Sequence, residues 1–298
     1  TAGSQHYANP ITLNQSVVFV ADSLNWGKVT ATAANIGLTL STNVAQVLQD
    51  ISITGDLDVT TGMGGQVGGV SQAANTSVQI GGSTTFTAHT TQAQVANLSN
   101  TGNSFAKPLS FLTSNGGSWS LADVKSETAL IMGTTNIDGP IQLQTTKGDI
   151  SQSGPMNITG TAKFKALAGG VLLNNMDNVF VKRVSVDTPG AFKITAKGPL
   201  SMDQVKVGLD SEIKSTGILD IGMGTYAGKI KASSGGFDIK QSGNITFGSD
   251  ADFDAGTAKI ELMSPLNMWK GALVFKGGVI IINHPSLMNA VNAGTLVV

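Results

Sequence analysis

The sequence predicts an all-β solenoid built from about four degenerate units. Three observations support this prediction: an internal repeat, short strands that end at turn-forming residues, and an unusual composition. Charged residues make up 12 % of the 298-residue chain and hydrophobic residues 41 %, with 37 glycines. The charged share is about half of that in ordinary globular proteins. Apolar residues nevertheless recur at short intervals, so the chain is expected to fold rather than to remain disordered.

The internal repeat is centred on a Phe-x-Ala motif. Its four copies begin at Phe19, Phe86, Phe164 and Phe253. A Gln-Ser or Ser-Gln pair precedes each copy, at 15–16, 71–72, 151–152 and 241–242. An asparagine follows each copy, one or two positions before an aromatic residue: Trp26, Phe105, Phe180 and Trp269. Copies lie 67 to 89 residues apart, too far for one solenoid turn and too irregular for propeller blades of about 40–50 residues.

This spacing predicts a unit of several coils, with insertions at the turns. We expect one solenoid over 1–298, with units at about 11–70, 71–150, 151–239 and 240–298. At roughly 20–25 residues per coil the chain would form about 12–14 coils, with a length on the order of 60 Å.

The N-terminal elements follow from local patterns. Residues 17–21 form a continuous apolar run and are expected to be a buried strand, whereas 29–40 alternate between apolar and polar residues as a half-buried strand does. In the segment 43–51 the apolar residues fall at i, i+3, i+4 and i+7, the spacing of one helix face. A short helix and a coil turn both remain open there.

From residue 51 onward the sequence predicts strands almost throughout. Residues 51–59 and 77–98 alternate, the glycine-dense stretch 60–70 reads as a turn region, and similar short strands recur to residue 282. Each ends at Gly, Asn, Asp or Pro, residues that accept the tight-turn backbone of a coil corner. Stacked coils would bury a structural core of Phe19, Trp26, Phe86, Phe105, Phe164, Phe180, Phe253 and Trp269.

Two stretches, 150–180 and 239–262, carry a resemblance to a known family. They resemble the repeats of filamentous-haemagglutinin-like bacterial surface adhesins, and the resemblance extends over about 70–290. It implies a right-handed parallel β-helix, export to the bacterial cell surface or beyond, and a role in adhesion or fibre formation. The expected partners are another surface protein or a glycan, or further copies bound end to end. Apolar sequence near the C-terminus, such as 279–282, favours end-to-end association because open sheet edges need a cap or a partner.

The sequence offers few residues for catalysis. If Phe253 points inward, Asp250, Asp252 and Asp254 share the outer face of one strand. Bound Ca²⁺ would relieve their repulsion, but the spacing matches no calcium loop, so a solvated acidic surface is the simpler interpretation. Asp210 and Asp220 are the only other pair to consider. A polysaccharide-cleaving β-helix of the pectinase or tailspike kind needs paired carboxylates, so the sequence predicts a protein without enzymatic activity or cofactor.

Charge and hydropathy exclude further classes. The net charge is −1, which gives no electrostatic attraction to nucleic acid. No apolar run reaches the 18 or more residues of a membrane-spanning helix. Residues 1–120 contain only two cations, Lys28 and Lys107. This neutral stretch is either a packing face or the result of sequence drift.

Overall fold

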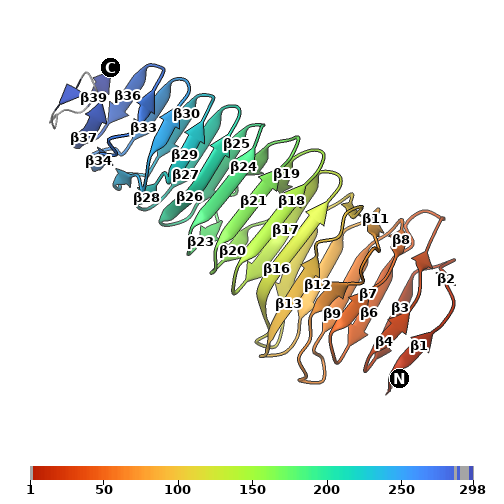
Figure 1. Cartoon of the computed structure of the whole chain (residues 1–298). Coiled ribbons are helices and arrows are strands. Elements are labelled where there is room, and N and C mark those ends of the chain that lie inside the picture. The colour runs from red at the N-terminus through yellow and green to blue at the C-terminus, as the bar shows by residue number, and fades with distance from the viewer. Residues whose placement is uncertain (1–2, 285–286, 289–294, 298) are drawn as a thin grey trace. The chain divides into compact units, whose positions relative to one another are not determined.

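The structure, a computed structural model, describes residues 3–284, 287–288 and 295–297, with side chains up to 283. Within these residues the chain contains strands and turns but no helix, and therefore no helix that could cross a membrane. The fold is a parallel β-solenoid of about 13 turns, as the sequence predicts. It forms two compact units, residues 1–159 and 160–298, in each of which the strands stack as successive rungs (Figure 1).

The first unit has three stacks of parallel strands and one short pair. One stack contains β3 (Val17–Ala21), β6 (Leu38–Thr42), β9 (Leu57–Thr61), β12 (Thr84–Ala88), β15 (Leu109–Thr113), β17 (Leu130–Ile137) and β19 (Ile150–Gln152), with β20 (Met156–Ile158) also on β17. A second contains β7 (Gln46–Leu48), β10 (Val70–Gln72), β13 (Ala93–Leu98), β16 (Ser118–Ser126) and β18 (Ile141–Thr145). The third contains β2 (Ile11–Thr12), β5 (Val29–Thr30), β8 (Ile51–Ile53), β11 (Val78–Ile80) and β14 (Ser104–Phe105), and β1 (Gln5–Tyr7) pairs with β4 (Leu24–Trp26).

The second unit repeats this plan. One stack contains β22 (Val171–Leu173), β25 (Phe192–Ala196), β27 (Ser211–Ser215), β30 (Ile230–Ser233), β33 (Ala251–Asp254) and β36 (Leu273–Lys276). Another contains β21 (Ala162–Ala166), β24 (Val184–Thr188), β26 (Leu200–Val207), β29 (Met223–Tyr226), β32 (Ile245–Phe247) and β35 (Met268–Trp269). The remaining strands are β23 (Val179–Phe180), β28 (Leu219–Asp220), β31 (Ile239–Lys240), β34 (Lys259–Leu262), β37 (Val279–His284), β38 (Leu287–Met288) and β39 (Thr295–Val297). β38 pairs antiparallel with β37, and β39 pairs antiparallel with β36.

The core forms where the period-two pattern of every strand points the apolar residues inward. Phe86 stacks on Phe111 of the next coil with ring centroids 5.6 Å apart, and Phe253 stacks on Phe275 at 5.3 Å. Of the eight aromatic residues expected in the core, Trp26, Phe86, Phe105, Phe164, Phe180 and Phe253 are buried. Phe19 and Trp269 are half-buried. Their strands, β3 and β35, pair on one side only within the described residues, which accounts for the partial exposure of these two rings.

The segment 43–51 forms a coil corner and not a helix. It contributes strand β7, turns at residues 49–50 and enters β8 at Ile51. Gln46 and Leu48 are buried whereas Val47 is 45 % exposed, which is the two-residue alternation of a strand. Parallel pairing with β10 and β11 thus overrides the local helical spacing of the apolar residues.

Two motifs of the internal repeat meet across neighbouring coils. The buried Asn103 and the half-buried Gln72 exchange two side-chain hydrogen bonds, of 2.8 and 3.0 Å, and Asn103 Oδ1 also accepts the Val78 N–H at 2.9 Å. In the second unit Gln241 and Asn267 exchange two bonds of 2.9 and 2.8 Å. We refer to each pair as an amide clamp. The clamps account for the joint recurrence of a Gln-Ser or Ser-Gln pair and an Asn near an aromatic residue in the second and fourth copies of the repeat.

Candidate functional site: a lysine-lined groove

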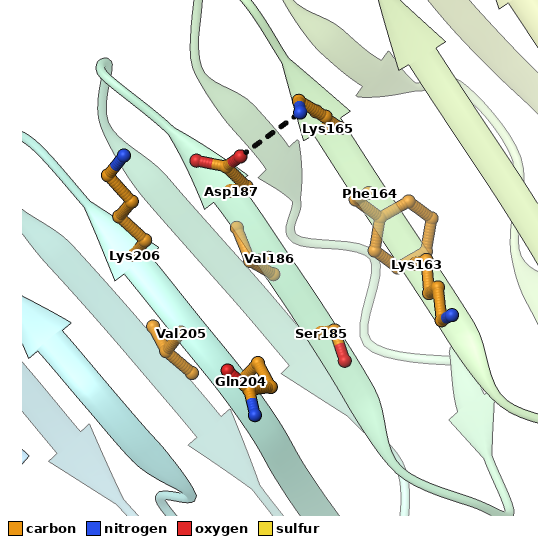
Figure 2. A pocket seen from close by; sticks show the side chains of 9 residues that line it. All are labelled: Lys163, Phe164, Lys165, Ser185, Val186, Asp187, Gln204, Val205 and Lys206. Carbon is orange, nitrogen blue, oxygen red and sulfur yellow. Dashed lines mark ion pairs between the residues drawn. The ribbon is translucent and has the colours of Figure 1, made fainter.

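The candidate site is a groove on the outward side of β21, β24 and β26 in the second unit (Figure 2). Its volume is about 330 Å³, at the lower end of the range for ligand pockets. Outward-facing side chains line it above a floor of buried apolar residues: Lys163, Lys165, Ser185, Asp187, Gln204 and Lys206, over Phe164, Val186 and Val205. We refer to this feature as the lysine groove.

Strand register brings the charged residues of the groove together. Lys165, Asp187 and Lys206 are neighbours in register across β21, β24 and β26. They therefore form a row perpendicular to the strands, with the carboxylate between the two ammonium groups (Figure 2). Each side chain points outward because the residues that flank it in its strand are buried.

A β-bulge shapes the other end of the groove. Val184 pairs with Met202, but Val186 pairs with Val205, so two residues of β26 stand opposite the single residue Ser185. An extra residue of this kind bends its strand locally and redirects a side chain. This bend accounts for the hollow beside Ser185, where the exposed Gln204 and Lys163 lie.

The lysine groove carries a net positive charge. Lys165 Nζ lies 3.5 Å from Asp187 Oδ2, and both side chains are about half exposed. In the part of the chain that the structure describes, Lys163 and Lys206 make no ion pair. The nearby Asp203 instead pairs with Arg183, whose Nη1 lies 3.6 Å from its Oδ1. Two ammonium groups are thus left without a carboxylate partner at an open surface.

Two of the three aspartates around Phe253, Asp250 and Asp254, pair with lysines of neighbouring coils. Lys229 Nζ lies 3.1 Å from Asp250 Oδ2, and Lys276 Nζ lies 3.1 Å from Asp254 Oδ2. Asp252 points outward from β33, as expected from the buried Phe253. Lys229 holds the pKa of Asp250 below its usual value, and chiefly the Gly256 N–H does the same for the pKa of Asp254. Among the residues described, no three His, Asp or Glu side chains gather closely enough to hold a metal ion.

Asp210 and Asp220 lie in different surroundings. Asp220 is only 6 % exposed, and its Oδ1 accepts the Gly222 N–H at 2.9 Å. Asp210 is exposed at the corner before β27, where its Oδ1 accepts the Lys229 N–H at 2.9 Å. Asp220 therefore stabilises a turn of its own coil inside the solenoid, whereas Asp210 joins its corner to the backbone of the next coil at the surface.

Sequence reasoning missed the lysine groove. The alternation around Phe164 shows that Lys163 and Lys165 point outward, but nothing in the sequence places them beside Lys206, 41 residues further along the chain. The missing information is the coil length, which sets the register. The bulge in β26 changes that register within one strand, so a fixed repeat length would not have found the groove.

The stacked coils and the outward-facing groove define a repeat β-solenoid. The family described as "Repeats of unknown function (DUF5649)" matches residues 27–111, 117–187 and 208–276. The chain belongs to this family, because the matches cover well over half of it. Each matched repeat contains one Phe-x-Ala motif, at Phe86, Phe164 and Phe253, while Phe19 precedes the first match. No curated protein and no solved structure matches the chain.

Proposed function

We propose that this chain is an extracellular, non-enzymatic segment of a bacterial surface adhesin, and that its lysine groove binds an acidic glycan. The observation that carries the proposal is the row of Lys165, Asp187 and Lys206 with Lys163 nearby, at an open and largely apolar surface hollow. The resemblance to filamentous-haemagglutinin-like repeats supports the surface location and the adhesive role.

The chemistry of the groove fits repeated negative charges on a polymer. Lysine ammonium groups act as mobile point charges, whereas two-point recognition of a single planar anion is better served by arginine. The groove is open along its length, so a chain of sugars can pass through it without having to end there. Because the net charge of the protein is −1, the attraction would be local to the groove and not a property of the whole surface.

The acidic side chains support a role without catalysis. Glycoside hydrolysis requires two carboxyl groups flanking the scissile bond. The lysine groove is lined by one carboxylate, Asp187, which is already paired with Lys165. The protein would then act through binding alone, with the stacked strands as a stiff support.

A binding assay tests this proposal. Purified chain is passed over immobilised polygalacturonate and over neutral dextran, at low and at physiological salt. We expect retention on polygalacturonate only, and loss of retention when Lys163, Lys165 and Lys206 are all changed to Gln. The matched control changes three exposed lysines elsewhere to Gln, Lys28, Lys240 and Lys270, and should be retained like the parent chain.

Three other results would contradict parts of the proposal. Equal loss of retention in both triple variants would mean that the groove is not the binding site. Release of new reducing ends from the polymer would instead identify a polysaccharide-cleaving β-helix. Electron micrographs that show filaments growing with protein concentration would identify a head-to-tail fibre subunit in place of an adhesin segment.

A further inference from the structure

The second unit has another outward surface on which charges alternate in sign. It is the outward side of β25, β27, β30 and β33, and we refer to it as the charged face. Four residues occupy the same register position on these successive strands: Lys193, Glu212, Lys231 and Asp252. The order along the stack is therefore positive, negative, positive, negative.

We propose that the charged face binds the charged face of a second copy of this chain, side by side and antiparallel. A two-fold axis along the strand direction, between β27 and β30, reverses the order of the four charges in the second copy. Glu212 then faces the second copy's Lys231, and Lys193 faces the second copy's Asp252. Every charge of the column meets its opposite, because reversing an alternating row of four gives the complementary row.

The neighbouring column on the same strands is compatible with this arrangement. Its residues are Thr195, Lys214, Ser233 and Asp254, in that order. The same axis places Thr195 opposite Asp254 and Lys214 opposite Ser233. No two like charges meet, and each charged group faces a hydroxyl.

Part of the column has no ionic partner within its own chain. Lys193 Nζ lies 3.6 Å from Glu212 Oε2, but Lys231 and Asp252 make no ion pair with any residue that the structure describes. Both are exposed. Cross-strand pairing inside one chain therefore accounts for only half of the alternation, and a facing copy would supply partners for the other half.

The lysine groove shows that such self-complementarity is not general to this solenoid. Its row reads positive, negative, positive, from Lys165 through Asp187 to Lys206. A two-fold axis through that row would bring lysine against lysine and aspartate against aspartate. Of these two charged surfaces, only the charged face can pair with itself.

The size of the charged face predicts a weak, salt-sensitive association. Four strands about 4.8 Å apart and about five residues long cover roughly 300 Å², less than half of what each partner contributes to a standard interface. We expect a dissociation constant in the range of about 10 µM to 1 mM at low salt. Many copies held on one surface would pair cooperatively through their high local concentration.

Charge reversal with complementation tests the proposal. The E212K and K231E variants each place two like-charged pairs in the dimer, so sedimentation velocity at low salt should show association at least ~10-fold weaker than for the parent chain. An equimolar mixture should restore it, because Glu212 of one copy meets Lys231 of the other, and the two reversed residues meet each other. The matched control, E261K mixed with K240E, carries the same net charges off this face and should leave association at the parent level.

Several outcomes would overturn the proposal. One is a parent chain that stays monomeric up to about 1 mM at low salt, a result that does not depend on the folding of any variant. Another is unchanged self-association of both single variants. A third is a mixture of E212K and K231E that associates no better than either variant alone. Circular dichroism spectra identical to the parent would show that loss of association is not loss of fold.

Discussion

Removing the Asn103 side chain tests whether the amide clamp holds neighbouring coils together. Asn103 is fully buried. Its Oδ1 accepts from Gln72 and from the Val78 N–H, and its Nδ2 donates to Gln72 and to the Leu98 carbonyl at 3.0 Å. The Asn103→Ala variant leaves the Val78 and Leu98 backbone groups inside the protein without these partners.

The expected loss of stability follows from those two groups. A buried polar group without a hydrogen bond costs about 1–3 kcal/mol, so the two groups together should destabilise the first unit of Asn103→Ala by roughly 2–6 kcal/mol. Gln72 is only half-buried, and its amide can turn toward water. A double-mutant cycle with Gln72→Ala should therefore give a smaller coupling energy, about 1–2 kcal/mol.

The assay combines urea unfolding with native-state hydrogen exchange. Exchange at the Val78 amide reports on the clamp directly, even if the coils do not unfold all together. The control is Asn97→Ala, because Asn97 is exposed and its side chain accepts from Ser99 alone, two residues away. A loss for Asn103→Ala within about 0.5 kcal/mol, as is usual for surface substitutions, would refute the role assigned to the clamp.

Three further predictions concern the second unit. Burial raises the pKa of Tyr226 above its usual 10, so the unfolded state loses this proton first. Stability should fall above pH 10 by up to ~1.4 kcal/mol per pH unit, and Tyr226→Phe should flatten that fall in urea titrations. Gly224 has φ +129°, and an added Cβ would overlap the Val205 carbonyl oxygen, whereas Gly198 has φ +88° and open space. Thermal melts should therefore show a larger loss of stability for Gly224→Ala than for Gly198→Ala. The Gly198→Ala variant strains only the backbone and so measures the ~1–2 kcal/mol backbone cost by itself. The lowered pKa of Asp254 means that its stabilising contribution is present above about pH 4 and disappears at more acidic pH. In Asp254→Asn the free energy of unfolding should fall less steeply on acidification than in the parent chain. An unchanged dependence on pH would contradict the lowered pKa of Asp254.

The fold class could be predicted from the sequence because it depends on local patterns of apolar, polar and turn-forming residues. Alternation around Phe86, Phe164 and Phe253 identifies inward and outward positions on each strand, and glycine and asparagine mark the corners. Val47 shows where such reasoning fails: its spacing from neighbouring apolar residues suits a helix face, but pairing between coils fixes a strand. Long-range pairing is invisible to a local pattern.

The candidate site was harder to predict because it depends on register between coils. Lys165 and Lys206 lie in one row only after two coil lengths and the bulge in β26 are known. The amide clamp is an intermediate case. Its two halves are visible in the sequence as recurring motifs, but their contact requires that Gln72 and Asn103, 31 residues apart, occupy adjacent positions on stacked coils.

Register also gives a physical reason for the uneven distribution of charge along the chain. In a parallel stack, equivalent outward residues of successive coils are only about 4.8 Å apart, and like charges facing each other there are destabilising. A column of such residues can therefore be uncharged or can alternate in sign. In the first unit, Thr39, Asp58, Thr85 and Ser110 form a column with one charge.

The second unit avoids stacked like charges by alternating the sign of the charges on neighbouring coils. Eight of the nine ion pairs within the described residues lie there, and most join neighbouring coils, as Lys193 and Glu212 do. Asp58 shows what happens without a cation beside it: burial, and then the nearby Asp56, raise its pKa, while the hydroxyl of Thr85 partly offsets the rise. Random drift would leave like charges stacked on one another. The alternating column of Lys193, Glu212, Lys231 and Asp252 in the second unit avoids that conflict, which favours selection over drift on this outer face. A first-unit column with a single charge is compatible with either.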